Sequence, residues 1–85
     1  MLYKYYMKAD LNFMRSVFKN SLNLNNYELN LDSEFESVPQ WDSLGHMKII
    51  SEIESRLNLD FEIDEIVGVN TVKKLIDMVN SKLKK

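Results

Sequence analysis

The chain has 85 residues, enough for one small domain, and with 45% hydrophobic and 28% charged residues it has the composition of a soluble globular protein with one core. It has no cysteine, which excludes disulfides and thiolate metal sites and favours a cytoplasmic location. The net charge of −2 argues against nucleic-acid binding, and the apolar stretches are too short to span a membrane or form a signal peptide.

The first predicted helix runs from about Met7 to Leu22, where apolar residues recur every three or four positions. Asparagines then favour a turn, and a long loop continues to Gln40. Pro39 excludes a helix across this point. We expect four apolar side chains to hold the loop on the core: Leu29, Leu31, Phe35 and Val38.

The second predicted helix runs from Ser43 or Leu44 to Leu57, and Asp42 and Ser43 both suit its N-terminus. Its wide apolar face consists of Leu44, Met47, Ile49, Ile50, Ile53 and Leu57.

Two further elements follow. One or two helical turns around residues 63–67 end at Gly68, and a final amphipathic helix runs from its N-cap, Thr71, to Leu83. Together these elements predict an all-α fold, a small four-helix bundle of three main helices and one short helix.

Ser43 is the first candidate functional residue. It lies directly after Asp42 at the start of a helix, where backbone N–H groups and the positive end of the helix dipole stabilise a phosphoester. Spacing alone, however, favours a plainer interpretation in which Ser43 only caps the helix.

A wider pattern around this serine resembles the acyl carrier protein family. It comprises the run Asp42, Ser43 and Leu44, with Phe35 eight residues before the serine and Thr71 and Val72 nearly thirty after it. The pattern extends without insertion from about Leu11 to Leu83. It implies that a phosphopantetheinyl transferase attaches 4'-phosphopantetheine from coenzyme A to Ser43, with Asp42 and Leu44 as flanking recognition residues. The arm then carries acyl or aminoacyl groups as thioesters, and the chain itself is not an enzyme.

The resemblance also implies how partners bind. Residues 32–65 hold ten acidic residues against Lys48 and Arg56, a balance of −8, and acyl-loading and acyl-processing enzymes with basic docking surfaces would recognise Glu52 and Glu54 in this segment. The alternative is a solvated face that keeps the protein soluble.

The resemblance also concerns the apolar residues beside the arm. Leu44 and Met47 would touch the partners, with core packing an equal alternative for Met47. We expect one carrier domain over residues 1–85, with residues 1–6 as an N-terminal extension, and a monomer.

Three neighbouring residues have other possible roles. His46 lies one helical turn after Ser43, which suggests a serine and histidine nucleophile pair, but no second carboxylate or oxyanion-hole motif accompanies it. We expect a surface histidine instead, and Trp41 as a packing anchor of the loop. With one histidine and no calcium-loop pattern, no metal site is expected.

Two interpretations of the function therefore remain. The main alternative to a carrier is a carrier-like helical module that is never modified and serves for binding or as a scaffold, and the intact Ser43 argues against it. Fatty acid carriers typically have acids two and five positions after the serine, where this chain has Gly45 and Lys48. This departure predicts a dedicated carrier of a specialised pathway.

Overall fold

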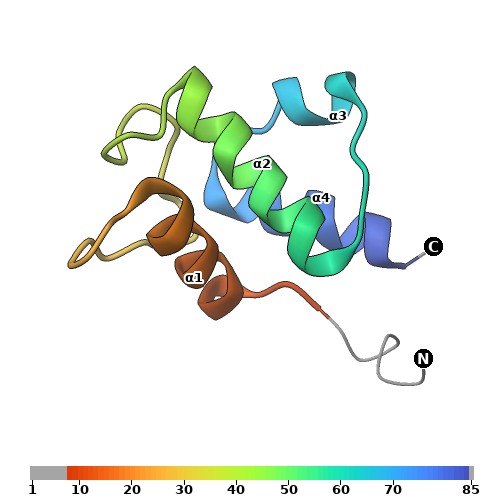
Figure 1. The fold of residues 1–85 in the computed structure, drawn as a ribbon, viewed down its shortest axis with the longest axis horizontal. Coiled ribbons are helices and arrows are strands. Elements are labelled where there is room, and N and C mark those ends of the chain that lie inside the picture. The colour runs from red at the N-terminus through yellow and green to blue at the C-terminus, as the bar shows by residue number, and fades with distance from the viewer. Residues whose placement is uncertain (1–7, 85) are drawn as a thin grey trace.

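The computed structural model describes residues 8–84, and within them the chain forms a bundle of four helices (Figure 1). They are α1 (Leu11–Leu22), α2 (Ser43–Leu57), α3 (Ile63–Val67) and α4 (Val72–Leu83). Figure 1 shows α2 in the middle, α1 on one side of it and α4 behind it. The predicted all-α bundle of three main helices and one short helix is confirmed.

The helix boundaries follow from local capping. Asp10 accepts a hydrogen bond from the Phe13 N–H at 2.8 Å, so α1 begins at Leu11 and the expected start near Met7 is wrong for residues 8–10. Met7 itself and the expected extension of residues 1–6 lie outside the described residues. The expected limits of α2, Ser43 and Leu57, are confirmed.

The later boundaries also agree with the expectation. The Thr71 hydroxyl accepts a hydrogen bond from the Lys74 N–H at 3.1 Å and caps α4, and Gly68 ends the five-residue α3.

The core draws apolar side chains from all four helices. The buried residues are Met14, Val17, Phe18 and Leu22 of α1, Ile49, Ile50 and Ile53 of α2, Ile66 of α3, and Val72, Leu75, Ile76 and Val79 of α4. Because the three long helices each bury an apolar stripe here, the bundle holds the start of α2 in a fixed place.

The loop between α1 and α2 is tied to the bundle at both side chains and backbone. Leu29 and Val38 are buried and Phe35 is half-buried, as expected, but Leu31 is 45% exposed. Its backbone makes the contact instead: the Leu31 carbonyl accepts a hydrogen bond from the Lys73 N–H at 2.9 Å. The Val72 N–H likewise donates to the Ser33 carbonyl at 3.1 Å. The loop therefore satisfies two N–H groups at the start of α4 that have no partner within the helix.

The end of this loop lies against the first turn of α2 at Gly45. Gln40 has a left-handed backbone, with φ 65°, and its carbonyl oxygen occupies the space that a Cβ at Gly45 would fill. The Leu22 side chain of α1 also lies close, with its Cδ2 3.0 Å from the same position. Gly45 thus admits the backbone of its own loop.

Replacing Gly45 by alanine should therefore destabilise the fold. A methyl group would overlap a backbone carbonyl, and we expect this to outweigh the gain in helix propensity of about 1 kcal/mol. The free energy of unfolding should fall by about 1–3 kcal/mol, measured by chemical denaturation.

The second glycine of the chain provides the control for this substitution. Gly68 has φ −84°, and no atom lies within 4 Å of the place that an alanine Cβ would take. Gly68→Ala should leave stability unchanged or raise it by up to about 1 kcal/mol. Equal effects of the two substitutions would contradict the close approach at Gly45.

Candidate functional site

Ser43 is the first residue of α2, and its hydroxyl is not used to cap the helix. Asp42 does that work: its Oδ1 accepts a hydrogen bond from the Gly45 N–H at 2.9 Å, and its carbonyl accepts one from the His46 N–H at 2.7 Å. The interpretation of Ser43 as a plain helix cap is therefore wrong. Its side chain is exposed and makes no hydrogen bond to any of residues 8–84.

The electrostatic setting of this hydroxyl favours a bound phosphate. The first N–H groups of a helix have no acceptor within it, and within residues 8–84 the Gly45 N–H is the one among them that is paired, with the Asp42 carboxylate. The N–H groups of Ser43 and Leu44 remain at the positive end of the dipole of a 15-residue helix. An exposed hydroxyl next to two free donors fits the phosphoester of a phosphopantetheine arm.

A buried hydrogen bond between Trp41 and His46 joins the end of the loop to the first turn of α2. The Trp41 Nε1–H donates to His46 Nδ1 at 2.9 Å, and His46 Nε2 lies 3.1 Å from the Ile66 carbonyl oxygen. A neutral imidazole that carries its proton on Nε2 satisfies both contacts. Phe18 packs edge-on against the indole, with ring centroids 4.8 Å apart. The expected role of Trp41 as a packing anchor is confirmed, since it is almost fully buried.

The same contacts correct the expectation for His46. Its side chain is only 8% exposed, because hydrogen bonds to the loop and to α3 replace those that water would make. Both ring nitrogens are thereby occupied, and neither is free to take a proton from Ser43. The arrangement agrees with the rejection of a serine and histidine nucleophile pair.

The apolar residues expected near the arm lie on the surface of α2. Leu44 is 68% exposed and Met47 is 43% exposed, so the alternative of core packing is wrong for Met47. The apolar face expected for α2 is thus two surfaces: a buried one with the three isoleucines, and an exposed one with these two residues.

The two glutamates expected on the docking face contact other parts of this chain. Glu52 pairs with Arg56 at 2.7 Å, and Arg56 also donates to the Ser16 hydroxyl of α1 at 2.9 Å. Glu54 accepts a hydrogen bond from the Phe61 N–H at 3.0 Å. Glu54 thus connects α2 to the segment before α3, and Glu52 is paired within α2 with the arginine that contacts α1. Their recognition by partners remains a prediction.

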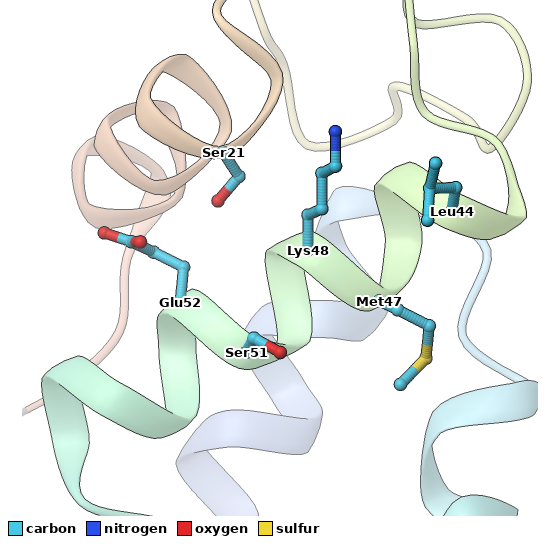
Figure 2. Close-up of a pocket in the computed structure, with 6 residues that line it drawn as sticks. All are labelled: Ser21, Leu44, Met47, Lys48, Ser51 and Glu52. Atoms are coloured by element: carbon cyan, nitrogen blue, oxygen red, sulfur yellow. The ribbon is translucent and has the colours of Figure 1, made fainter.

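A shallow groove runs between the last turn of α1 and the exposed side of α2, close to Ser43 (Figure 2). It is lined by Ser21, Leu44, Met47, Lys48, Ser51 and Glu52. Ser51 and Ser21 were not among the residues predicted from the sequence. Ser51 follows Met47 and Lys48 at helical spacing and could have been found, whereas Ser21 reaches the groove only because α1 packs against α2.

Two other kinds of feature are absent from the part of the chain that the structure describes. Within residues 8–84, no helix is long and apolar enough to cross a membrane. The same residues bring no three histidine, aspartate or glutamate side chains together as metal ligands.

Comparisons with known proteins agree with this geometry. A family model described as "Phosphopantetheine attachment site" matches residues 12–79. The holo acyl carrier protein of Geobacter metallireducens is 26% identical over 87% of this chain and 85% of its own, with a TM-score of 0.78. The acetyl actinorhodin acyl carrier protein of Streptomyces coelicolor is 26% identical over 89% of this chain and 92% of its own, with a TM-score of 0.76. No curated protein matches the chain.

The buried hydrogen bond between Trp41 and His46 should be measurable as a coupling. Trp41→Phe removes the donor and leaves the imidazole nitrogen unpaired, which we expect to cost about 1–3 kcal/mol of unfolding free energy. A double-mutant cycle with His46→Leu, measured by chemical denaturation, should give a coupling energy of at least about 0.5 kcal/mol. Additive losses would mean that this bond contributes nothing to stability.

Proposed function

Because the chain belongs to the family of carrier proteins with a phosphopantetheine attachment site, we propose that Ser43 is the residue that holds the cofactor. The chain is an acyl carrier protein, and its cofactor is covalently attached 4'-phosphopantetheine. When bound, the arm supplies a thiol that carries an acyl or aminoacyl group as a thioester.

One observation carries the assignment to Ser43: its hydroxyl is exposed at the start of α2 and makes no hydrogen bond within residues 8–84, since Asp42 caps the helix in its place. The free N–H groups of the first turn support the phosphate of the ester. Leu44 lies beside it with most of its side chain exposed, available to the transferase. We assign flanking recognition to Asp42 and Leu44.

The carriers of this family are generally not catalytic, and we extend this to the present chain. His46 uses both ring nitrogens within the core, so Ser43 has no histidine to activate it. The chain acts by raising the effective concentration of its tethered cargo at an enzyme that it binds.

Members of this family interact with a phosphopantetheinyl transferase and with biosynthetic enzymes. We propose that the partner enzymes here load and process the acyl group and meet the acidic segment with basic docking surfaces. Exposed carboxylates of this segment support this, among them Asp60 and Asp64 before and within α3. We further propose one carrier domain over residues 1–85 that works as a cytoplasmic monomer.

The pathway is proposed to be a specialised one. Fatty acid carriers typically have acids at the positions of Gly45 and Lys48. At Gly45 the carbonyl of Gln40 leaves no room for any side chain, so the missing acid there reflects packing. Lys48 is exposed on α2, and of these two positions it is the one that supports a different partner, because a lysine repels the basic residues that an acid attracts. The likeness to the actinorhodin carrier supports such a pathway.

Modification at Ser43 is tested by intact mass. Incubation with coenzyme A, magnesium and a broad-specificity phosphopantetheinyl transferase should add one phosphopantetheine to the wild type and none to Ser43→Ala. Ser55→Ala, which changes another exposed serine of α2, should be modified like the wild type. An unmodified wild type would favour the alternative, a carrier-like module for binding or scaffolding.

The two roles of Asp42 can be separated by two substitutions. Asparagine caps helices as well as aspartate does, whereas alanine costs about 0.5–2 kcal/mol. If the transferase recognises the carboxylate, Asp42→Asn should lower the rate of modification and leave the melting temperature unchanged. Asp42→Ala should lower both the rate of modification and the melting temperature. A wild-type rate of modification for Asp42→Asn would restrict Asp42 to capping.

The pathway is tested by competition between carriers. Holo protein loaded with malonyl groups and the fatty acid carrier of the same cell are offered to that cell's elongation enzymes. We expect poor turnover on this chain, because Lys48 repels their basic docking residues. Equal or better turnover would contradict a specialised role.

A further inference from the structure

The groove beside Ser43 contains a lysine, Lys48, that has no partner in the part of the chain that the structure describes. Lys48 is exposed on α2 and forms no hydrogen bond or ion pair with any of residues 8–84. Figure 2 shows its side chain extending from α2 on the side where the last turn of α1 lies. The exposed side of α2 therefore has a positive charge here, although the net charge of residues 32–65 is −8.

The acid that would neutralise Lys48 is held elsewhere. Glu52 lies four residues after Lys48, but its carboxylate pairs with Arg56 at 2.7 Å and turns toward α1 (Figure 2). On a helix, an acid that precedes a base by four residues pairs better than the reverse order, which favours Arg56 over Lys48. Arg56 is fixed in turn by the Ser16 hydroxyl and by the Phe13 ring, whose centroid lies 5.8 Å from the guanidinium carbon.

The surroundings of Lys48 have the composition of an interface. Leu44 and Met47 line the same groove and are exposed large apolar side chains. Ser21 also lines it, with a buried Oγ that has no hydrogen-bond partner in residues 8–84. Exposed apolar side chains next to polar groups mark surfaces that bind another protein.

We propose that the enzymes that load and process the cargo of this carrier dock in this groove with a carboxylate that pairs with Lys48, between apolar residues that cover Leu44 and Met47. This rests on the proposed carrier function and specifies its partner. Covering Lys48 with an uncharged or basic surface would leave a desolvated charge unpaired or opposed, whereas a carboxylate compensates it. Basic residues of the same enzymes meet the carboxylates outside the groove, so the docking surface of the partner has both signs in a fixed arrangement.

The experiment uses the holo protein and a purified acyl-loading enzyme of the same cell that acylates it, with kcat/KM for acyl transfer as the readout. Lys48→Glu should lower kcat/KM by about 3- to 10-fold, and Lys48→Arg, which keeps the charge, should stay near the wild type. The loss should shrink when salt rises from about 0.01 M to about 0.1 M, which shortens the Debye length from about 30 Å to about 10 Å.

Lys19→Glu is the matched control, with the same change of net charge. Lys19 is exposed on α1 and lies two residues before Ser21, or about 200° around the helix from the groove. It should load like the wild type. Equal losses at residues 19 and 48, or no loss at residue 48, would overturn the proposal.

Zero-length crosslinking tests the contact directly. A carbodiimide adds to a carboxylate of the enzyme and forms an activated ester. The Lys48 amine attacks the acyl carbon of this ester, the carbodiimide leaves as a urea, and an amide joins the two chains. Mass spectrometry of the complex should find this amide between Lys48 and an aspartate or glutamate of the enzyme, and Lys48→Arg should abolish it. Crosslinks from other lysines only would count against the proposal.

Two further measurements separate docking through Lys48 from binding of the cargo by Lys48 and from a failure of the carrier function. The transfer rates are measured with acetyl and with malonyl cargo. An effect of Lys48 confined to malonyl would mean that the lysine binds the cargo, and it would overturn the docking proposal. Intact mass is recorded first. A wild type that gains no phosphopantetheine contradicts the carrier function, whereas a fully modified wild type with loading insensitive to residue 48 contradicts only the docking proposal.

Discussion

Burial of Trp41 at the end of the long loop is the contact on which the site depends. The indole packs against Phe18 of α1 and donates its N–H to His46 of α2, so the loop end is fixed to both helices at once. The next residue, Asp42, is then placed to cap α2, and Ser43 becomes the first helical residue with its hydroxyl free. Without this anchor, no buried side chain would hold the residues between Val38 and the serine.

In the segment around Ser43, the buried residues fix the backbone and the exposed residues are available for function. Trp41, Gly45 and His46 face the core, whereas residues 42–44 are exposed. The buried residues fix the backbone, and the exposed ones remain available to the transferase and other partners. Such a division suits a carrier, because a site is positioned more precisely when rigid elements hold its backbone.

Much of the fold could be predicted because it depends on local rules. Caps and periodicity placed the limits of α2 and α4 and the end of α3 at Gly68. Errors arose where a contact depends on residues far apart in sequence. His46 is buried because Ile66, twenty residues later, offers it a carbonyl, and no local pattern indicates that partner. Periodicity also could not divide the apolar face of α2 into its buried and exposed parts, since both consist of apolar residues at helical spacing.

The charge of the site shows why composition alone does not describe a docking surface. The segment from residue 32 to 65 sums to −8, yet Glu52 and Glu54 are bound to Arg56 and to the Phe61 N–H, while Lys48 is bound to nothing within residues 8–84. A carboxylate already paired within its own chain has less charge to offer a partner than one left in water. In the groove beside Ser43, internal pairing therefore occupies Glu52 and leaves Lys48 as the charge for a partner to match.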